Sequence, residues 1–352
     1  MNVFHSNIQP FNHSNVIIWF WFVQIKCFKS FANLHLIKKK AIFDFGNHII
    51  GCMLSVKNLT KEFKNLIVVD NLSFEVSEGK IFGLLGPNGA GKTTTIRTIL
   101  NIIRPSSGNI FFDGKPITTE FFNIIGYLPE ERGLYKKSRV IDVIKYFAVL
   151  KNIQAKKAIS LADEWLNKLD LWDLKEKKIE ELSKGNQQKV QFITSVLHEP
   201  KLLILDEPFA GFDPINQEKI KELILSFVDQ GKIIILSTHQ MDTAEKLCSD
   251  IMLIDRGKEV CSGSLKEIKK QFGLNVVSVG FSGNISEIKN HPNVIDMNLY
   301  GNRAEIKLKE EVQQSEFLRS ISQQYSINSF NPIDPSLHKI FIDVIQRNAD
   351  IR

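Results

Sequence analysis

A short glycine-rich segment, Gly86–Thr93, carries the residues with the clearest chemical potential. It reads GPNGAGKT and fits the spacing G-x-x-x-x-G-K-[ST] of phosphate-binding loops. Its glycines let the backbone curl so that N–H groups converge on an anion. Lys92 can reach the β- and γ-phosphates of a nucleotide, and the Thr93 hydroxyl can hold Mg²⁺. The predicted nucleotide site comprises Gly86, Pro87, Asn88, Gly89, Ala90, Gly91, Lys92, Thr93 and Thr94.

An acidic pair, Asp206 and Glu207, follows the apolar run at 202–205. An Asp at the end of a strand places a carboxylate beside Mg²⁺. The adjacent Glu207 can polarise a water against the γ-phosphate, as a general base or as an orienting group. Acidic pairs are common at strand ends, but the combination with a phosphate-binding loop favours the chemical role.

The elements around these motifs predict an α/β fold. Lys80–Leu85 is typical of a buried strand and Thr94–Ile102 of a helix, so the loop lies where a helix N-terminus faces an anion. Strands then alternate with helices, which indicates a parallel sheet covered on both faces. The predicted strands are 202–205, 233–236 and 251–254, and the predicted helices are 214–228 and 241–248.

Three further regions differ in pattern. Short strands separated by turns are expected between Leu54 and Asp113, at 54–58, 66–69, 72–76, 81–85 and 109–112. Residues 138–199 have helical periodicity and predict a helical insert. From 273 to 352 we expect a separate small α/β domain, with a hairpin about Gly301–Asn302 and helices at 314–325 and 337–344.

A third motif leads to a family. The segment Leu182-Ser183-Lys184-Gly185-Asn186 lies between the glycine-rich loop and the acidic strand, and it resembles the signature segment of ABC ATPases. Residues 210–214 resemble the D-loop of that family through Asp213, His239 resembles its switch histidine, and Phe63 resembles the aromatic that stacks on adenine. The resemblance covers about residues 54–270 and implies ATP and Mg²⁺ as cofactors. It also implies a P-loop ATPase domain at 53–272 with a RecA-like core, an antiparallel β subdomain and a helical subdomain.

Two motifs depart from the usual family pattern. In the signature, Lys184 replaces Gly and Asn186 replaces Gln, while Ser183 and Gly185 are kept. In the Q-loop region, Glu130 replaces Gln; a carboxylate can still coordinate Mg²⁺, although its charge changes the affinity for the metal. Together with the segment 127–135, these departures resemble the sodium-extrusion (Nat-type) subgroup of bacterial ABC exporters.

Three of these residues also have ordinary structural readings. Phe63 is one of 25 phenylalanines and could simply pack in a core or at a sheet edge. His239 could be a hydrogen-bonded histidine at a strand end. Asp213 could be only the N-cap of a helix starting at Pro214, or it could serve both purposes.

In the family, the signature of one subunit faces the P-loop of another. One P-loop and one signature per chain therefore imply a homodimer or a pair with a homologous ATPase subunit, in which Ser183, Gly185 and Asn186 act in trans. No segment after Met53 is long and apolar enough to cross a bilayer. The resemblance thus implies separate transmembrane permease subunits, a place in the cytoplasm at the inner face of the cell membrane, and export driven by ATP hydrolysis.

Composition adds weaker constraints. The net charge of +6 comes from dispersed lysines and gives little support to nucleic-acid binding, so no nucleic-acid partner is expected. The four cysteines have neither metal-ligand nor disulfide-framework spacing, which suits a reducing compartment. Residues 1–52 differ from the rest and are expected to be a non-native or disordered extension before a start at Met53. A membrane-surface anchor with lysines at 38–40 is the alternative.

Other classes of ABC ATPase are alternatives to an exporter subunit. A translation-factor ATPase would carry two ATPase modules in one chain, and a DNA-repair ATPase would carry long heptad arms. A soluble ATPase for iron–sulfur assembly or regulation is the harder alternative. The C-terminal domain and the exporter-like segment around Glu130 count against it.

Overall fold

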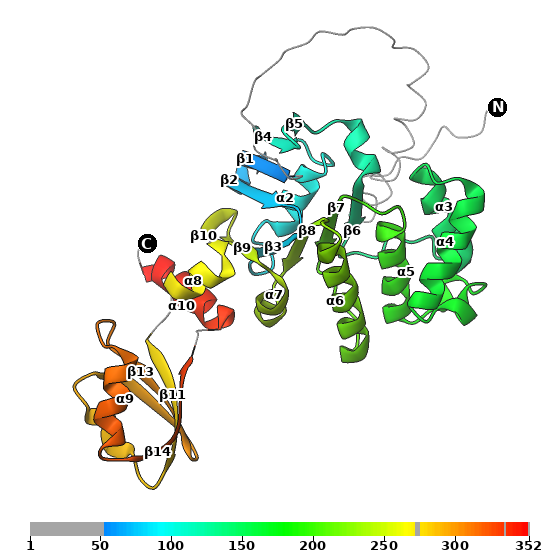
Figure 1. The fold of residues 1–352 in the computed structure, drawn as a ribbon. Helices are drawn as coiled ribbons and strands as arrows, with labels where there is room; N and C mark the ends of the chain where they lie inside the picture. Colours follow the sequence, from blue (N-terminus) through cyan, green and yellow to red (C-terminus); the bar gives the residue numbers. More distant parts are fainter. Residues whose placement is uncertain (1–52, 272–274, 334–335, 351–352) are drawn as a thin grey trace, which may run out of the picture.

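The computed structural model describes residues 53–271, 275–333 and 336–350. The expected extension at 1–52 lies outside this part of the chain, as do residues 272–274, where the sequence predicts a domain boundary. Figure 1 shows two β-sheets with their helices, followed by a third, smaller sheet near the C-terminus. Among the described residues, no helix has the length and apolar character needed to span a membrane.

A six-stranded sheet forms the centre of the fold, in the order β10-β9-β3-β8-β7-β6. Its inner neighbours pair in parallel, and only β10 runs antiparallel to β9. The strands are β3 (Lys80–Leu85), β6 (Ile125–Leu128), β7 (Leu202–Asp206), β8 (Ile233–Thr238), β9 (Asp250–Asp255) and β10 (Lys258–Ser264).

Helices cover both faces of this sheet because its strands are apolar on both sides. In β7, Leu202 and Ile204 belong to one buried cluster, whereas Leu203 and Leu205 belong to another. The first cluster includes residues of α2 (Lys92–Ile99), and the second includes residues of α5 (Lys184–Val196), α6 (Pro214–Asp229) and α7 (Met241–Leu247). The alternation places α2 and α5 on opposite faces of the sheet.

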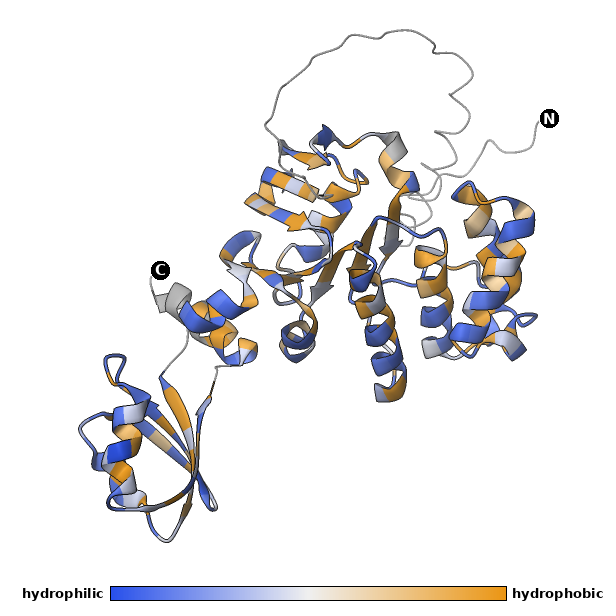
Figure 2. Cartoon of the chain, viewed as in Figure 1, coloured by the Kyte–Doolittle hydropathy of each residue, from blue (hydrophilic) through white to orange (hydrophobic). Residues whose placement is uncertain are grey.

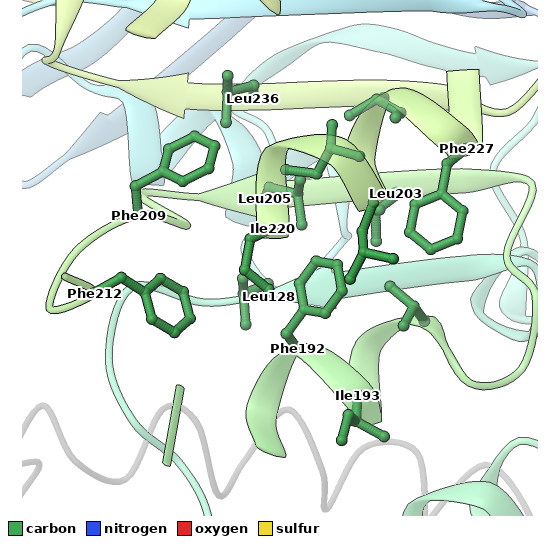
Figure 3. Packing of buried hydrophobic residues seen from close by; sticks show 14 of the residues in the cluster. Leu128, Phe192, Ile193, Leu203, Leu205, Phe209, Phe212, Ile220, Phe227 and Leu236 are labelled. Atoms are coloured by element: carbon green, nitrogen blue, oxygen red, sulfur yellow. The ribbon is translucent and has the colours of Figure 1, made fainter. Parts of the chain in front are cut away.

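Aromatic rings fix α5 and α6 against the sheet. Phe192 of α5 and Phe227 of α6 stack with ring centroids 6.5 Å apart, and both point towards Leu203 and Leu205 (Figure 3). Figure 2 shows that the central strands are hydrophobic along their length, whereas the outer helices carry one hydrophobic face. Helix α5, which begins in the segment that resembles a signature, is therefore held by the same core as the acidic strand β7.

A second, antiparallel sheet has the order β2-β1-β4-β5. It comprises β1 (Met53–Phe63), β2 (Leu66–Ser77), β4 (Ser107–Phe112) and β5 (Lys115–Pro116). Two of the short strands predicted from the sequence, 66–69 and 72–76, form the single strand β2. A local irregularity separates them, since Asn71 has φ 54° and the register with β1 shifts there.

The helical insert consists mainly of α3 (Val140–Leu150), α4 (Ala155–Lys168) and α5, with α3 packed against both others. Short 3₁₀ helices lie at Thr119–Asn123, Trp172–Leu174, Ile179–Glu181 and Ser286–Asn290. The sequence predicts one apolar face from Val140, Val143, Ile144, Phe147 and Leu150; the first four are buried and Leu150 is half-buried.

The small third sheet has the order β12-β13-β11-β14 and is covered by α9 (Gln314–Ser322). Its strands are β11 (Val276–Ser282), β12 (Val294–Tyr300), β13 (Arg303–Leu308) and β14 (Ser326–Ile333). The expected hairpin about Gly301 is present as β12 and β13. Before and after this sheet come α8 (Leu265–Gln271) and α10 (Leu337–Asp350), which lie together between it and the central sheet (Figure 1).

The C-terminal helix α10 does not pack in the core of the small sheet. Leu337, Ile340 and Val344 are buried in the cluster of the central sheet, and the Leu337 amide donates a 2.8 Å hydrogen bond to Glu245 on α7. The apolar spacing of 337–344 predicts an amphipathic helix, but it does not indicate which core the helix joins.

Candidate ATP-binding and hydrolytic site

The chemically capable residues follow four neighbouring parallel strands at the same edge of the central sheet. Leu85 of β3 pairs with Thr238 of β8, Ser237 with Asp206 of β7, and Leu205 with Leu128 of β6. The carboxyl ends of these strands therefore lie side by side, which is where ligands bind in open α/β sheets. Sequence-distant motifs at 86–94, 128–130, 206–207 and 238–239 meet at this edge.

The glycine-rich loop is held in a shape that requires glycine. Gly91 is the N-cap of α2 with φ 106°, and a Cβ there would lie 2.6 Å from the Val68 carbonyl oxygen. Gly257, in the turn between β9 and β10, donates to the Ala90 carbonyl and accepts from the Asp70 amide. The loop is thus braced by both sheets, and Gly257 is a supporting residue that the sequence motifs did not reveal.

Lys92 points its ammonium back over the loop. Its Nζ donates to the carbonyl oxygens of Gly86 at 2.8 Å and Pro87 at 3.1 Å, and lies 3.9 Å from Glu207 Oε1. Burial lowers the pKa of Lys92, and the nearby carboxylates of Glu207, Asp206 and Glu130 oppose that shift. The structure therefore brings this cation to the acidic pair, at the N-terminus of α2, where an anion is favoured.

Asp206 has the character of a metal ligand. Its Oδ1 accepts a hydrogen bond from Ser237, whereas its Oδ2 is buried and has no hydrogen-bond partner among the described residues. Burial raises the pKa of Asp206, against the effect of Ser237 and of the nearby Thr93 hydroxyl. A buried, unpaired carboxylate oxygen beside a hydroxyl is a donor set that suits Mg²⁺.

Glu207 is fixed by the residues at the end of β8. Its Oε1 accepts from the His239 amide at 2.9 Å and lies 2.7 Å from His239 Nδ1, and its Oε2 accepts from Thr238 Oγ1 at 3.1 Å. Glu207 has φ 49°, a left-handed conformation that costs a non-glycine residue about 1–3 kcal/mol and is concentrated at functional sites. His239 thus contacts the carboxylate directly, in addition to its predicted place near the phosphate.

Glu130 lies just beyond β6 and is exposed. Its charge acts on both Lys92 and Asp206: it opposes the lowering of the Lys92 pKa and adds to the raised pKa of Asp206. The structure therefore brings Glu130 to the same site as the phosphate-binding loop and the acidic pair.

Phe63 lies at the end of β1 and is 42% exposed, with Lys61 Nζ 4.7 Å above its ring centre. This exposure excludes the core position that was one alternative for Phe63, whereas the other alternative, packing at a sheet edge, is compatible with it. An accessible ring face is the geometry that stacking on a nucleobase needs.

The signature residues lie apart from the phosphate-binding loop of the same chain, because α5 and α2 pack on opposite faces of the sheet. Ser183 is the N-cap of α5, and its Oγ accepts from the Asn186 amide. A Cβ on Gly185 would lie 3.6 Å from the Gly211 carbonyl oxygen, next to the D-loop. Asp213 does cap α6, with Oδ1 accepting from the Asn216 amide at 2.9 Å.

Comparison with known proteins agrees with this arrangement. A family model described as ABC transporter matches residues 69–210, and one described as "ATP-binding protein DrrA1-3-like, C-terminal domain" matches residues 263–345. The chain is 41% identical over 293 residues to an uncharacterized ABC transporter ATP-binding protein, YhaQ, of Bacillus subtilis (strain 168), covering 83% of this chain and 98% of that protein. The chain belongs to the ATP-binding subunits of ABC transporters.

The chain is also similar to an export ATP-binding protein and to a solved structure of an ATP-binding subunit. It is 34% identical over 231 residues to the Nod factor export ATP-binding protein I of Cupriavidus metallidurans, covering 64% of this chain and 76% of that protein. A solved structure of an ATP-binding subunit of an ABC transporter superposes with a TM-score of 0.59 at 30% identity, covering 63% of this chain and 93% of the other. The family binds and hydrolyses ATP, and the predicted fold class is confirmed.

Proposed function

We propose that this ABC subunit hydrolyses Mg²⁺-ATP to drive export through a separate membrane permease. The observation that carries the proposal is the convergence of Lys92, Asp206 and Glu207 at one sheet edge, with Asp206 Oδ2 buried and unpaired among the described residues. Similarity to an export ATP-binding protein supports the direction of transport.

In this proposal each group has a defined task. Lys92 and the amides at the N-terminus of α2 bind the β- and γ-phosphates. Thr93, Asp206 and Glu130 would hold Mg²⁺, which supplies charge neutralisation between the phosphate oxygens. Phe63 stacks on adenine.

Glu207 positions the attacking water as a general base or orienting group. His239 keeps the Glu207 carboxylate in place through its 2.7 Å contact and senses the γ-phosphate.

A second subunit completes the site. Ser183, Gly185 and Asn186 begin a helix whose N-terminus has no phosphate of its own chain to bind, so we infer that they contact the γ-phosphate held by a partner ATPase subunit. That contact exists with ATP and is lost with ADP, so hydrolysis opens the dimer. Asp213 lies next to this interface in the same proposal.

The permease would dock beside the segment from Glu130 to Tyr135 and the helical insert. Tyr135 and Tyr146 form an exposed edge-to-face pair there, with ring centroids 5.7 Å apart, and Val149 of α3 is also exposed. Exposed aromatic and aliphatic side chains are enriched in protein interfaces. This docking places the subunit in the cytoplasm at the inner face of the membrane, and the segment at 127–135 supports the Nat-type subgroup.

The test is co-purification of the tagged full chain with a multi-span membrane protein from detergent-solubilised membranes, with Glu207→Gln assayed beside the wild type. We expect Glu207→Gln to bind ATP but to lose at least about 100-fold in turnover, as expected when a water-activating group is removed. We also expect it to accumulate as an ATP-bound dimer.

Wild-type turnover in Glu207→Gln would contradict the role of Glu207. Full ATPase activity without any membrane partner in the purified material would instead favour a soluble, non-transport ATPase.

A further inference from the structure

A buried glutamine links the signature helix to the segment that carries Glu130. Gln191 lies in the middle of α5 and is 4% exposed. Its Nε2 donates hydrogen bonds to the carbonyl oxygens of Pro129 at 3.3 Å and Glu131 at 3.0 Å. One side chain therefore holds the main chain on both sides of Glu130.

The chemistry of the two carbonyls fixes the orientation of the amide. Only the NH₂ group can face two acceptors at once, so the Oε1 atom must point away. That Oε1 atom is buried and has no hydrogen-bond partner among the described residues. A buried unpaired acceptor costs stability, so Gln191 is not explained as a group that serves folding alone.

The same region also contacts Gly211, in the segment at 210–214 that resembles a D-loop. Arg132, which follows Glu131, reaches Gly211: a Cβ on Gly211 would lie 2.9 Å from Arg132 Nη2. Gly185 at the start of α5 lies near the same glycine, since an ideal Cβ on Gly185 would be 3.6 Å from the Gly211 carbonyl oxygen. The segment around Glu130, the signature helix and the D-loop thus meet at one junction.

We propose that Gln191 is a positioning residue for the ATPase reaction. It holds Glu130 towards Lys92 and Asp206, and it makes the segment at 129–132 move together with α5. Ser183 lies eight residues before Gln191, about 12 Å along the same helix. A displacement of Glu130 on ATP binding is thereby transmitted to the signature that meets the partner subunit. The inference rests on the proposed role of Glu130.

The test uses the full chain with Gln191→Met, which keeps the length of the side chain but removes the donor. Amide hydrogen exchange in peptides covering 129–134 is measured without nucleotide, and turnover is measured against Mg²⁺ concentration. We expect faster exchange in this segment, a higher half-saturating Mg²⁺ concentration and a turnover about five- to 150-fold lower. That range corresponds to the loss of both hydrogen bonds of the Gln191 amide, at about 0.5–1.5 kcal/mol each.

Ser195→Ala is the matched control, because Ser195 is a buried polar residue on the same helix whose hydroxyl bonds only locally, to the Phe192 carbonyl. It should change neither exchange at 129–134 nor the Mg²⁺ dependence.

A double-mutant cycle with Glu130→Ala separates positioning from a general loss of structure. If Gln191 acts through Glu130, Gln191→Met should have almost no further effect on turnover in the Glu130→Ala background.

Two results would overturn the inference while leaving the proposed function intact. One is a turnover loss in the double mutant equal to the product of the two single losses; the other is amide exchange at 129–134 that stays at the wild-type rate in Gln191→Met. Wild-type turnover in Glu130→Ala would overturn the role of Glu130 in the proposed function, and this inference with it.

Discussion

At the scale of single residues, the site is built from groups that are costly to keep in the folded state. Asp206 is a buried carboxylate with a raised pKa and one unpaired oxygen, and Glu207 adopts a left-handed backbone conformation. Lys92 is an ammonium with a pKa lowered by burial. Such costs persist in a native fold where the surrounding structure enforces them, and here two sheets and the end of β8 do so.

A half-buried histidine outside the site should make stability depend on pH. His198 contacts the first residue of β6: its Nε2 is 2.7 Å from the Ile125 carbonyl oxygen. The same oxygen also accepts a hydrogen bond from Lys151 Nζ. The Nδ1 atom is buried without a hydrogen-bond partner in the described structure, so a second ring proton would find no acceptor. Burial, with smaller contributions from Lys151 and Lys232, lowers the His198 pKa to about 3.

The direction of the pH effect on stability follows from the difference between the His198 pKa in the folded and unfolded chain. The unfolded chain takes up a proton on this histidine near pH 6.5 and the folded chain only near pH 3, so stability is full above pH 6.5 and falls as the pH drops through that window. Between pH 6 and pH 4, we expect the free energy of unfolding of the wild type to fall by about 1 kcal/mol per pH unit more than that of His198→Gln. Urea unfolding at several pH values measures this; parallel curves for the two proteins would contradict it.

At the scale of elements, the phosphate-binding loop works because β3, β2 and the turn at Gly257 enclose it. Gly91→Ala would place a methyl group 2.6 Å from the Val68 carbonyl oxygen, in a backbone region unfavourable for alanine. We expect at least about a tenfold loss in affinity for ATP, since the loop or β2 must shift. Binding of a fluorescent ATP analogue measures the effect.

Gly231→Ala is the control for this change. Gly231 also has positive φ, at +76°, but a Cβ there meets no atom within 4 Å. It should cost about 1 kcal/mol of stability and leave nucleotide affinity unchanged. Equal affinities for the two variants would show that contact with Val68 does not shape the loop.

The strands of the central sheet differ in how well the sequence pattern predicts them. The fully buried strands β7 and β8 were predicted closely, because strands buried on both faces leave a continuous apolar pattern. β6 was not predicted, because Ile125–Leu128 is short and its place at the sheet edge follows from pairing with β7. The motifs identified Lys92, Asp206 and Glu207, but no motif points to Gln191 or Gly257, whose roles arise only from tertiary contacts.

At the scale of the whole molecule, the small sheet is attached to the ATPase body at both of its ends. The chain leaves through α8 and returns through α10, and the family model for the C-terminal domain, at 263–345, covers α8 and the first part of α10. Glu245 of α7 accepts from the Leu337 amide and pairs with Lys269 of α8 at 2.6 Å. Since α7 begins two residues after His239, α10 packs on the element that follows the proposed switch histidine.

Removing the apolar contact of α10 should therefore loosen α7 as well as the small sheet's attachment. Ile340 is 1% exposed in the central cluster, so Ile340→Asp would bury a charge without a partner and should lower stability by about 2–4 kcal/mol. Ile342→Asp introduces the same charge on the same helix at a side chain that is 40% exposed, and should cost less than about 0.5 kcal/mol.

Hydrogen exchange of peptides from α7 and α9, with thermal unfolding, distinguishes the outcomes. Undocking of α10 predicts faster exchange in α7 of Ile340→Asp, while α9 keeps its protection because its own core of Phe317 and Ile321 is untouched. Equal protection of α7 in both variants would mean that α10 is not coupled to the helix after His239. Loss of protection in α9 as well would mean that the small sheet depends on α10 to fold.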